Sequence, residues 1–207
     1  MDAIRIGELL KPFGCGQELT DHQVLQISTY LDLLLRWNEK MNLTAVREPE
    51  AVVQRHFGES LFAAHLIATN CAGAKSLADV GSGAGFPGLP VKIAIPQLNV
   101  TLIESQQKKA TFLREVIREL ALQDVQVSNV RAESLQQISD IATLRAVESF
   151  DKVLTIASRL VRTGGSLVLL IGAKQTKKAA SLLPEFKWDA FPIPMSDQRV
   201  IIIGRRA

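Results

Sequence analysis

The 207-residue chain is poor in cysteine and lacks long apolar runs, and both shortages limit what it can be. Its two cysteines, Cys15 and Cys71, form neither a CxxC motif nor a cluster with histidine. We therefore expect no disulfide framework and no metal site. No stretch of about 18 uninterrupted apolar residues occurs, so no transmembrane helix is predicted. Because Met1–Leu10 is mixed in charge and atypical of a signal peptide, we expect a cytoplasmic protein without a membrane partner.

The length and the charge of the chain are also limiting. A chain of 207 residues is long enough for one α/β domain with a modest extension, and too short for two full-sized domains. With 24 basic and 21 acidic residues, the formal net charge is +3. This slight excess indicates a polyanionic partner only weakly, because many proteins with no nucleic-acid role are equally basic.

The first third of the chain has helical periodicity. Apolar residues at i, i+3, i+4 and i+7 follow an N-cap at Thr20 and predict a helix that extends to Trp37. Pro49 opens a second helix, and Leu61–Ile67 forms a further helical stretch. We therefore predict that residues 1–73 form a helical extension packed on the core.

After Ala74 the pattern changes to short apolar runs that alternate with helical segments. This alternation predicts a Rossmann-like α/β domain over residues 74–207, with a mostly parallel, seven-stranded sheet and helices on both faces. The expected strands are Leu77–Val80, Val100–Ile103, Val125–Val130, Ile141–Leu144, Ser166–Ile171 and Val200–Ile203. The expected helices are Leu89–Ile95, Gln107–Leu122 and Phe150–Val161. The segment Trp188–Pro194 is compatible with a hairpin return and an antiparallel last strand, which the sequence leaves open.

A glycine-rich turn between a strand and a helix is the most informative motif. Glycines at 81, 83, 85 and 88 let a backbone turn tightly and approach a ligand closely, next to a helix N-terminus. Nineteen positions beyond Gly85, Glu104 ends the next strand, where an acidic side chain can accept both hydroxyls of a ribose. Tight packing or a solvated acid explains each feature alone. Together they predict a site for a nucleotide or nucleoside cofactor.

Two cofactors are compatible with this motif, a nicotinamide dinucleotide and S-adenosylmethionine. The turn satisfies GxGxxG, so a small nicotinamide-dependent reductase is one alternative. S-adenosylmethionine is favoured because Asp79 leads into the glycines, Pro87 stiffens the turn, and roughly 70 residues of helix leave no room for a separate substrate domain. The reductase would also lack a Tyr-xxx-Lys pair, since Tyr30 is the single tyrosine. A non-catalytic RNA-binding protein on the same fold is the second alternative.

Four motifs occur in order along the chain: Trp37-Asn38-xxx-Asn42-Leu43-Thr44, Arg55-His56-xxx-Ser60, Asp79-Val-Gly-Ser-Gly-Ala-Gly-Phe-Pro-Gly88 and Glu104-Ser-xx-Lys108-Lys109. In order and spacing they resemble the bacterial small-subunit rRNA guanine-N7 methyltransferases, also called glucose-inhibited division protein B. The resemblance extends from about Leu19 to Arg205. It implies a class I methyltransferase fold, S-adenosylmethionine as methyl donor, and a guanine N7 in 16S rRNA or the small ribosomal subunit as acceptor.

The resemblance also implies roles for individual residues. Seven residues are expected to line the cofactor, namely Gly81, Gly83, Phe86, Glu104, Ala132, Glu133 and Arg145. Glu104 would hold the ribose, and Ala132 and Glu133 would flank the adenine. Arg145 is also the expected catalytic residue, because its guanidinium can donate to guanine O6 or to a phosphate while N7 stays open to the methyl group. A structural salt bridge is the ordinary alternative for Arg145.

Four residues are expected to contact the substrate: Arg55, His56, Lys108 and Lys174. A histidine within a helical stretch is more often a packed or capping group than a catalyst, so His56 has both interpretations. The chain departs from the family pattern beside two of these residues. Glu59 replaces the usual aspartate of a His-xx-Asp-Ser motif, and Ile171-Gly172-Ala173-Lys174 replaces a Lys-Gly pair.

The implied reaction does not require a general base. Guanine N7 has a free lone pair, so the protein must position the acceptor and shape the electrostatics more than it must remove a proton. We expect phosphate contacts from a set of basic residues, Arg47, Arg55, Lys108, Lys109, Arg114, Lys174, Lys177 and Lys178. Because Phe86, Phe150 and Trp188 are expected to pack internally, we predict that the protein recognises the shape of a folded RNA. A monomer is expected.

Overall fold

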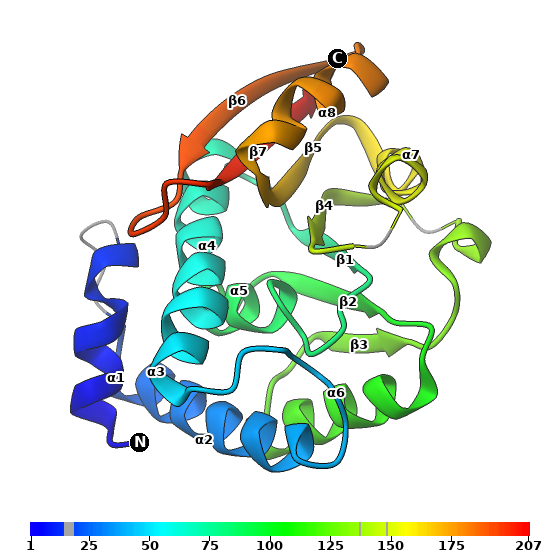
Figure 1. Ribbon diagram of the computed structural model, residues 1–207. Coiled ribbons are helices and arrows are strands. Elements are labelled where there is room, and N and C mark those ends of the chain that lie inside the picture. Colours follow the sequence, from blue (N-terminus) through cyan, green and yellow to red (C-terminus); the bar gives the residue numbers. More distant parts are fainter. Residues whose placement is uncertain (15–18, 137, 148) are drawn as a thin grey trace.

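The computed structural model describes residues 1–14, 19–136, 138–147 and 149–207. Cys15 lies outside these residues, and Cys71 is a half-buried free thiol. A twisted sheet runs through the molecule with helices on both of its faces, as Figure 1 shows. The predicted Rossmann-like architecture with seven mostly parallel strands is confirmed.

The sheet has a topological switch point. Its strands are β1 (Ser76–Val80), β2 (Asn99–Ile103), β3 (Val125–Ser128), β4 (Ser139–Arg145), β5 (Val161–Gly172), β6 (Phe186–Pro192) and β7 (Arg199–Arg206). Their spatial order is β3-β2-β1-β4-β5-β7-β6, and β7 is antiparallel to both neighbours. The chain moves outward from β1 to β3 and then crosses to the other side of β1 with β4. Ligands of open α/β sheets bind outside the carboxyl ends of the strands at such a point.

The antiparallel hairpin at the end of the chain completes the sheet. Sequence analysis located six of the seven strands, and the seventh, β6, covers part of the segment where a hairpin return was left open. Its register with β7 runs from Phe186 opposite Arg206 to Pro192 opposite Val200. A proline is tolerated there because β6 is an edge strand, where one side of the backbone has no ladder partner.

The helices confirm most predicted segments. They are α1 (Ala3–Leu10), α2 (Asp21–Asn38), α3 (Pro49–Val52), α4 (Glu59–Asn70), α5 (Gly88–Ala94), α6 (Gln107–Glu119), α7 (Phe150–Arg159) and α8 (Thr176–Leu182). Helix α2 begins with a capping box in which Thr20 and Gln23 exchange hydrogen bonds. Between α3 and α4 the chain continues as a π-helical segment, η2 (Val53–Gly58), where separate helices were expected. Sequence analysis did not predict α1 and α8.

Alternate residues of the strands enter two hydrophobic clusters, one on each face of the sheet. On one face, Leu77 and Val168 pack with apolar side chains of α1, α2, α4, α5 and α6. On the other face, Ala78 and Leu167 pack with α7 and α8. The predicted boundary after residue 73 falls between α4 and β1. The N-terminal helices share one hydrophobic cluster with the sheet, so the division of the chain into an extension and a domain stays a prediction. None of the described helices is long and apolar enough to cross a membrane.

Gly204 on β7 allows the β6–β7 hairpin to close, and this generates a stability prediction. A Cβ at Gly204 would lie 2.7 Å from Cζ3 of the Trp188 ring, so the ring would have to move. We expect Gly204→Ala to lower the free energy of unfolding by about 1–3 kcal/mol, measured by urea denaturation.

The matched control is Gly7→Ala in α1, where nothing lies within 4 Å of the added Cβ. There the free energy of unfolding should rise by about 0.5–1 kcal/mol, because alanine loses less conformational entropy on folding. Equal effects of the two substitutions would contradict the packing argument.

Candidate functional site

A cleft of about 860 Å³ opens at the carboxyl ends of β1, β2 and β4, beside the switch point. All seven residues expected at a cofactor line it together: Gly81, Gly83, Phe86, Glu104, Ala132, Glu133 and Arg145. The loop of residues 43–46 and the segment η2 contribute the opposite wall. The cleft is therefore bounded by the sheet on one side and by the N-terminal helical region on the other.

The glycine turn requires glycine for steric reasons. Gly83 and Gly85 have φ angles of 56° and 92°, in the region that side chains rarely adopt. A Cβ at Gly85 would also collide with the hydroxyl of Tyr30. A Cβ at Gly83 would have no heavy atom closer than 3.8 Å, because this glycine faces the open cleft. The turn is thus packed on its inner side and free to approach a ligand on its outer side.

Asp79 holds the turn from beneath. Its Oδ1 accepts a hydrogen bond from the Thr143 hydroxyl at 2.6 Å, and its Oδ2 accepts one from the Gly88 N–H at 3.2 Å. These bonds join β1 to β4 and to the start of α5. Burial raises the pKa of Asp79 to about 6, and the bonds from Thr143 and Gly88 oppose that rise. Asp79 is absent from the cleft wall, so it supports the turn without reaching a ligand.

Glu104 is held in place by backbone donors. Its Oε2 accepts from the Gly83 N–H at 3.0 Å, and its Oε1 accepts from the Gln106 N–H at 2.7 Å. Asn129 donates to the carbonyl oxygens of Glu104 and Ser105, which fixes the bend after β2. An ionised carboxylate offers about four acceptor positions, so two remain for hydroxyl donors in the cleft. This arrangement fits a ligand with a vicinal diol.

Arg145 lies in a buried ion-pair network that also includes a second arginine. Its Nη2 donates to Glu59 Oε2 at 3.0 Å and to the carbonyl of Arg55 at 2.5 Å. Glu59, 3% exposed in its side chain, also forms an ion pair with Arg199. Burial raises the pKa of Glu59, and the two arginines oppose that rise. The salt bridge considered as the ordinary alternative therefore exists, although the Arg145 side chain still lines the cleft.

The hydrogen bonds of His56 identify its tautomer. Arg145 Nη1 lies 2.9 Å from His56 Nδ1, and a guanidinium can only donate, so Nδ1 accepts. The proton is then on Nε2, which donates to Thr44 Oγ1 at 2.7 Å. Burial, helped by the charge of Arg145, lowers the pKa of His56 to about 3. His56 is therefore a neutral ring that connects the loop at Thr44 to Arg145.

Aromatic stacking joins the glycine turn to the helical wall. The Phe86 ring stacks on Tyr30 with centroids 5.3 Å apart, and the His56 ring lies 5.0 Å from the Phe86 centroid. The Tyr30 hydroxyl donates to the carbonyl oxygen of Ala84 within the turn. The guanidinium carbon of Arg145 lies 5.9 Å from the Phe86 centroid. One stack thus positions the turn, His56 and Arg145 relative to one another.

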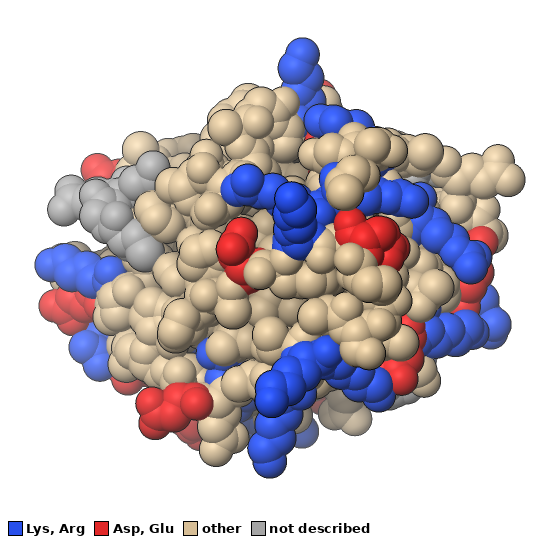
Figure 2. All heavy atoms as spheres, turned by 90° about the horizontal axis from the view of Figure 1, so that it is seen from above, with Lys and Arg blue, Asp and Glu red and all other residues tan. Residues whose placement is uncertain are grey.

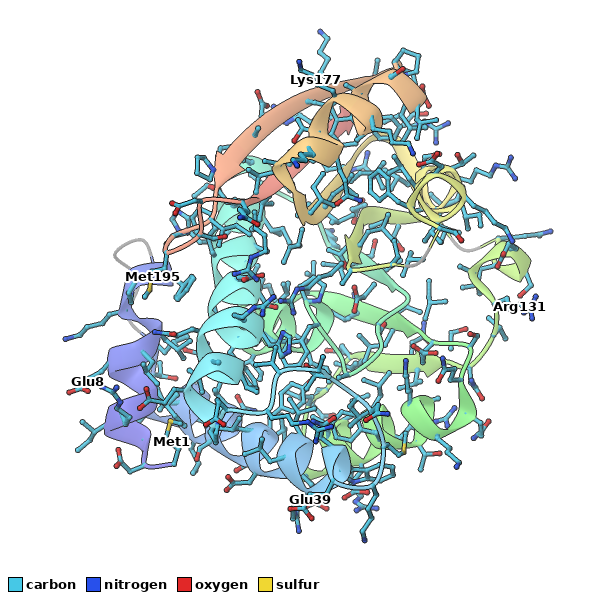
Figure 3. The ribbon with its side chains drawn as sticks, in the orientation of Figure 1. Met1, Glu8, Glu39, Arg131, Lys177 and Met195 are labelled. Carbon is cyan, nitrogen blue, oxygen red and sulfur yellow. The ribbon has the colours of Figure 1, made fainter. Side chains whose placement is uncertain are left out.

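The structure separates the residues that were expected to contact a substrate. Arg55 and His56 line the cleft, as does Lys109. Lys108 lines a neighbouring groove, and Lys174 is exposed in η4 (Ala173–Gln175) outside the cleft wall. Four other basic residues of the expected set do not line the cleft: Arg47, Arg114, Lys177 and Lys178. Lys177 points outward from α8 at the top of Figure 3.

Sequence reasoning missed three contributors to the site. Glu59 was noted only as a departure from a motif, yet it is the buried partner of two arginines. Arg199 lies in the C-terminal hairpin, and no motif near it indicated a role. Asn38 accepts from the N–H groups of Leu43 and Thr44 and so shapes the loop at the cleft.

Sequence relatives cover most of the chain. Residues 23–190 match the family described as rRNA small subunit methyltransferase G (GidB). A relative from Xylella fastidiosa (strain M23), named "Ribosomal RNA small subunit methyltransferase G", is 38% identical over 195 residues, which is 91% of this chain and 90% of the relative. A relative of the same name from Chloroflexus aggregans is 42% identical over 172 residues, which is 80% of this chain and 71% of the relative.

Solved structures share the fold at low identity. The ribosomal protein L11 methylase of Lactobacillus delbrueckii subsp. bulgaricus superposes with a TM-score of 0.60 at 15% identity, over 72% of this chain and 80% of that one. TYW2 of M. jannaschii, solved in complex with AdoMet, gives a TM-score of 0.57 at 13% identity, over 72% and 77% of the two chains. The class I methyltransferase fold that the sequence predicted is confirmed.

The buried carboxyl of Asp79 generates a prediction of pH dependence. Its pKa of about 6 in the folded protein exceeds the unfolded value of about 3.9, so the folded state binds more protons between these pH values. The contribution of Asp79 to the free energy of unfolding should therefore fall by about 2–3 kcal/mol as the pH rises from 4 to 6. In Asp79→Asn this fall should be missing when urea denaturation is repeated across the range.

The same substitution at the exposed Asp32 of α2 serves as the control. It should leave the pH dependence of unfolding like that of the wild type. If the free energies of unfolding of the wild type and of Asp79→Asn differed by the same amount from pH 4 to 6, the raised pKa of Asp79 would be refuted.

Proposed function

The chain belongs to the rRNA small subunit methyltransferase G family, and we propose that it transfers the methyl group of S-adenosylmethionine to N7 of a guanine, of the position 527 type, in 16S rRNA. One observation carries the proposal. The glycine turn with Glu104 and the buried Arg145 form facing parts of a single cleft at the switch point. This cleft offers a donor site and an acceptor site side by side.

The donor half of the cleft fits S-adenosylmethionine. This cofactor supplies a methyl group on a sulfonium that carries its own leaving group. Glu104 accepts the ribose hydroxyls with the lone pairs that the Gly83 and Gln106 amides leave free. The bare backbone at Gly83 allows close approach, and Ala132 in η3 (Ala132–Ser134) borders the adenine end. The TYW2 structure with AdoMet supports the same cofactor for this fold.

The acceptor half of the cleft needs no general base. A guanine N7 lone pair attacks directly, so the task of the protein is to orient the base and exclude water. Arg145 has five N–H groups, and its bonds to His56, Arg55 and Glu59 use three of them. The two that remain can donate to guanine O6 or to a phosphate. These three hydrogen bonds hold the guanidinium still, which pre-organises it for this contact.

The geometry of the cleft fits the two alternative functions, a reductase and a non-catalytic RNA-binding protein, less well. In a nicotinamide-dependent reductase the single tyrosine would have to reach the substrate, but the Tyr30 hydroxyl is buried against the carbonyl of Ala84. A non-catalytic RNA-binding protein would have no use for a cleft that combines a glycine turn with an acceptor for a diol. We further propose that the protein acts as a monomer in the cytoplasm, on 16S rRNA or on the small ribosomal subunit.

The proposed function is tested by incubating the protein with S-adenosylmethionine labelled in the methyl group and with unmodified 16S rRNA. Label should enter the RNA, and mapping of the modified base should identify one guanine methylated at N7. Transfer to protein alone, to another base atom, or to no acceptor would overturn the proposal.

Glu104→Ala tests the donor half of the site. We expect S-adenosylmethionine binding to weaken by about 1–3 kcal/mol, the cost of unpaired ribose hydroxyls, in isothermal titration calorimetry. Glu119→Ala, an exposed glutamate at the end of α6, is the control and should bind like the wild type. Wild-type affinity in Glu104→Ala would exclude the assigned ribose contact.

Arg145→Lys tests the acceptor half while retaining the positive charge beside Glu59. A lysine cannot reproduce the planar fork, so kcat should fall about 10- to 100-fold, which corresponds to about 1.4–2.8 kcal/mol. Cofactor affinity should change less than about threefold, measured by the same calorimetry. Arg162→Lys, at an arginine paired with Asp140 outside the cleft wall, should retain wild-type kcat. An unchanged kcat in Arg145→Lys would remove Arg145 from the reaction.

A further inference from the structure

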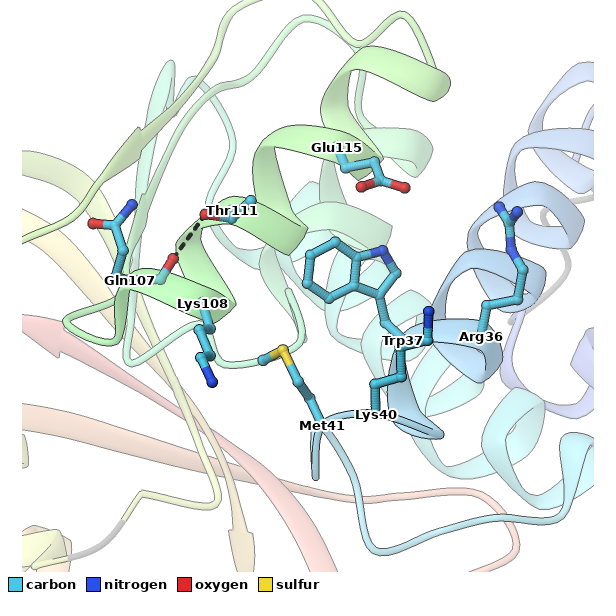
Figure 4. A pocket seen from close by; sticks show the side chains of 8 residues that line it. All are labelled: Arg36, Trp37, Lys40, Met41, Gln107, Lys108, Thr111 and Glu115. Atoms are coloured by element: carbon cyan, nitrogen blue, oxygen red, sulfur yellow. Dashed lines mark hydrogen bonds between the residues drawn. The ribbon is translucent and has the colours of Figure 1, made fainter.

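A second cavity, which we call the α2–α6 groove, has a volume of about 610 Å³. Figure 4 shows it between the end of α2 and the first half of α6. The lining residues are Arg36, Trp37, Lys40, Met41, Gln107, Lys108, Thr111 and Glu115. Its volume lies within the range of about 300–1,000 Å³ that is usual for small-molecule sites, so it can accommodate a nucleotide-sized group.

The groove combines an apolar surface with free positive charges. Trp37 packs against Phe112 with ring centroids 5.5 Å apart, yet it remains partly exposed. In Figure 4 the Trp37 indole lies between the two helices, with Met41 next to it. Within the described part of the chain, the cations that line the groove have no ion-pair partner; they are Arg36, Lys40 and Lys108. Glu115 is the single acid among the lining residues, so these side chains carry a net charge of +2.

Two short segments line both the groove and the cofactor cleft. On α6 and the turn before it, Gln107 and Lys108 line the groove, while their neighbours Gln106 and Lys109 line the cleft. After α2, Met41 lines the groove, and residues 43–46 line the cleft. The two cavities are therefore adjacent along two walls. A chain molecule that enters the cleft with one unit can place a neighbouring unit in the groove.

The distribution of positive charge does not by itself locate a binding surface for a polyanion on this protein. Seen from above in Figure 2, the Lys and Arg side chains form separate groups with acidic and uncharged surface between them. The α2–α6 groove differs because its cations flank a partly exposed indole. Cations that track a backbone, together with an aromatic surface for bases, are the usual features of a single-stranded nucleic-acid site.

We propose that the α2–α6 groove binds a nucleotide of the RNA strand that flanks the target guanine. A base contacts the exposed surface of Trp37 and Met41, and the adjoining phosphates pair with Lys40 and Lys108. This inference rests on the proposed function, and it adds to the expected recognition of folded shape a contact with one unpaired nucleotide. It also gives Lys108, which lies outside the cleft wall, a substrate contact.

The first test removes two charges from the groove with the double variant Lys40→Gln/Lys108→Gln. In methyl transfer to unmodified 16S rRNA, the KM for RNA should rise about fivefold or more, with kcat within about twofold of the wild type. The slope of log affinity against log salt should shrink by about 1.4–1.8, as two lost phosphate contacts require. The control, Lys11→Gln/Lys187→Gln, removes two exposed lysines from η1 (Lys11–Phe13) and β6. Its KM for RNA, its kcat and its salt slope should equal those of the wild type.

The second test observes the groove directly and needs no activity. The chain has two tryptophans, so Trp188→Phe leaves Trp37 as the only one. Unmodified 16S rRNA should quench the Trp37 emission at low salt, and S-adenosylmethionine alone should leave it unchanged. Adding Lys40→Gln/Lys108→Gln to this variant should shift the quenching to higher RNA concentrations. Emission that does not respond to bound RNA would overturn the proposal.

The outcomes distinguish this inference from the proposed function. Methyl transfer by the wild type together with an unchanged KM and salt slope in Lys40→Gln/Lys108→Gln would refute the groove and keep the function. Absence of transfer by the wild type would refute the function, while the Trp37 emission would still decide the groove. A defect seen with the assembled small subunit and absent with free rRNA would assign the groove to a ribosomal protein and overturn the proposal.

Discussion

The whole site depends on one buried carboxyl group, that of Asp79. It lies at the switch point of the sheet and receives hydrogen bonds from Thr143 on β4 and from the first residue of α5. Three elements that diverge from this point are thereby held at fixed separations, which gives the glycine turn its shape. Burial of a carboxyl group costs free energy unless its hydrogen bonds are satisfied, and the donors from Thr143 and Gly88 offset part of that cost.

The sheet and the segments that follow its strands supply most of the cleft, and the N-terminal region supplies one further wall, from residues 43–46, Arg55, His56 and Glu59. Tyr30 from α2 and His56 from η2 flank the Phe86 ring, so the helical region packs directly on the glycine turn. The same region provides Glu59, whose carboxylate neutralises part of the charge of Arg145. A buried guanidinium without such a partner would be strongly disfavoured. Removing the helices would therefore leave both the turn and Arg145 without support.

Patterns that depend on local sequence predicted most of this architecture. The glycine turn and Glu104 were located correctly because strand, turn and helix propensities are adjacent there, and their spacing carries geometric meaning. The pairing of Arg199 with Glu59 was not predictable, since it joins residues 140 positions apart that only the folded hairpin brings together. Strand β6 was left open as a possible hairpin return, because an exposed edge strand with a proline lacks a continuous apolar run. The short helix α8 has few buried residues and so a weak periodic pattern.

The protonation state of His56 links the fold to the chemistry. On the proposed function, the acceptor is a lone pair that must reach the cleft unprotonated and free of hydrogen bonds. A charged imidazolium at this position would offer a proton to guanine N7 and compete with the methyl group. The ring instead accepts from Arg145 at Nδ1 and donates to Thr44 from Nε2, so neither nitrogen has a proton available for the base. Burial among three arginines keeps it neutral. The arginines can then attract RNA phosphates while the side chain between them leaves the nucleophile untouched.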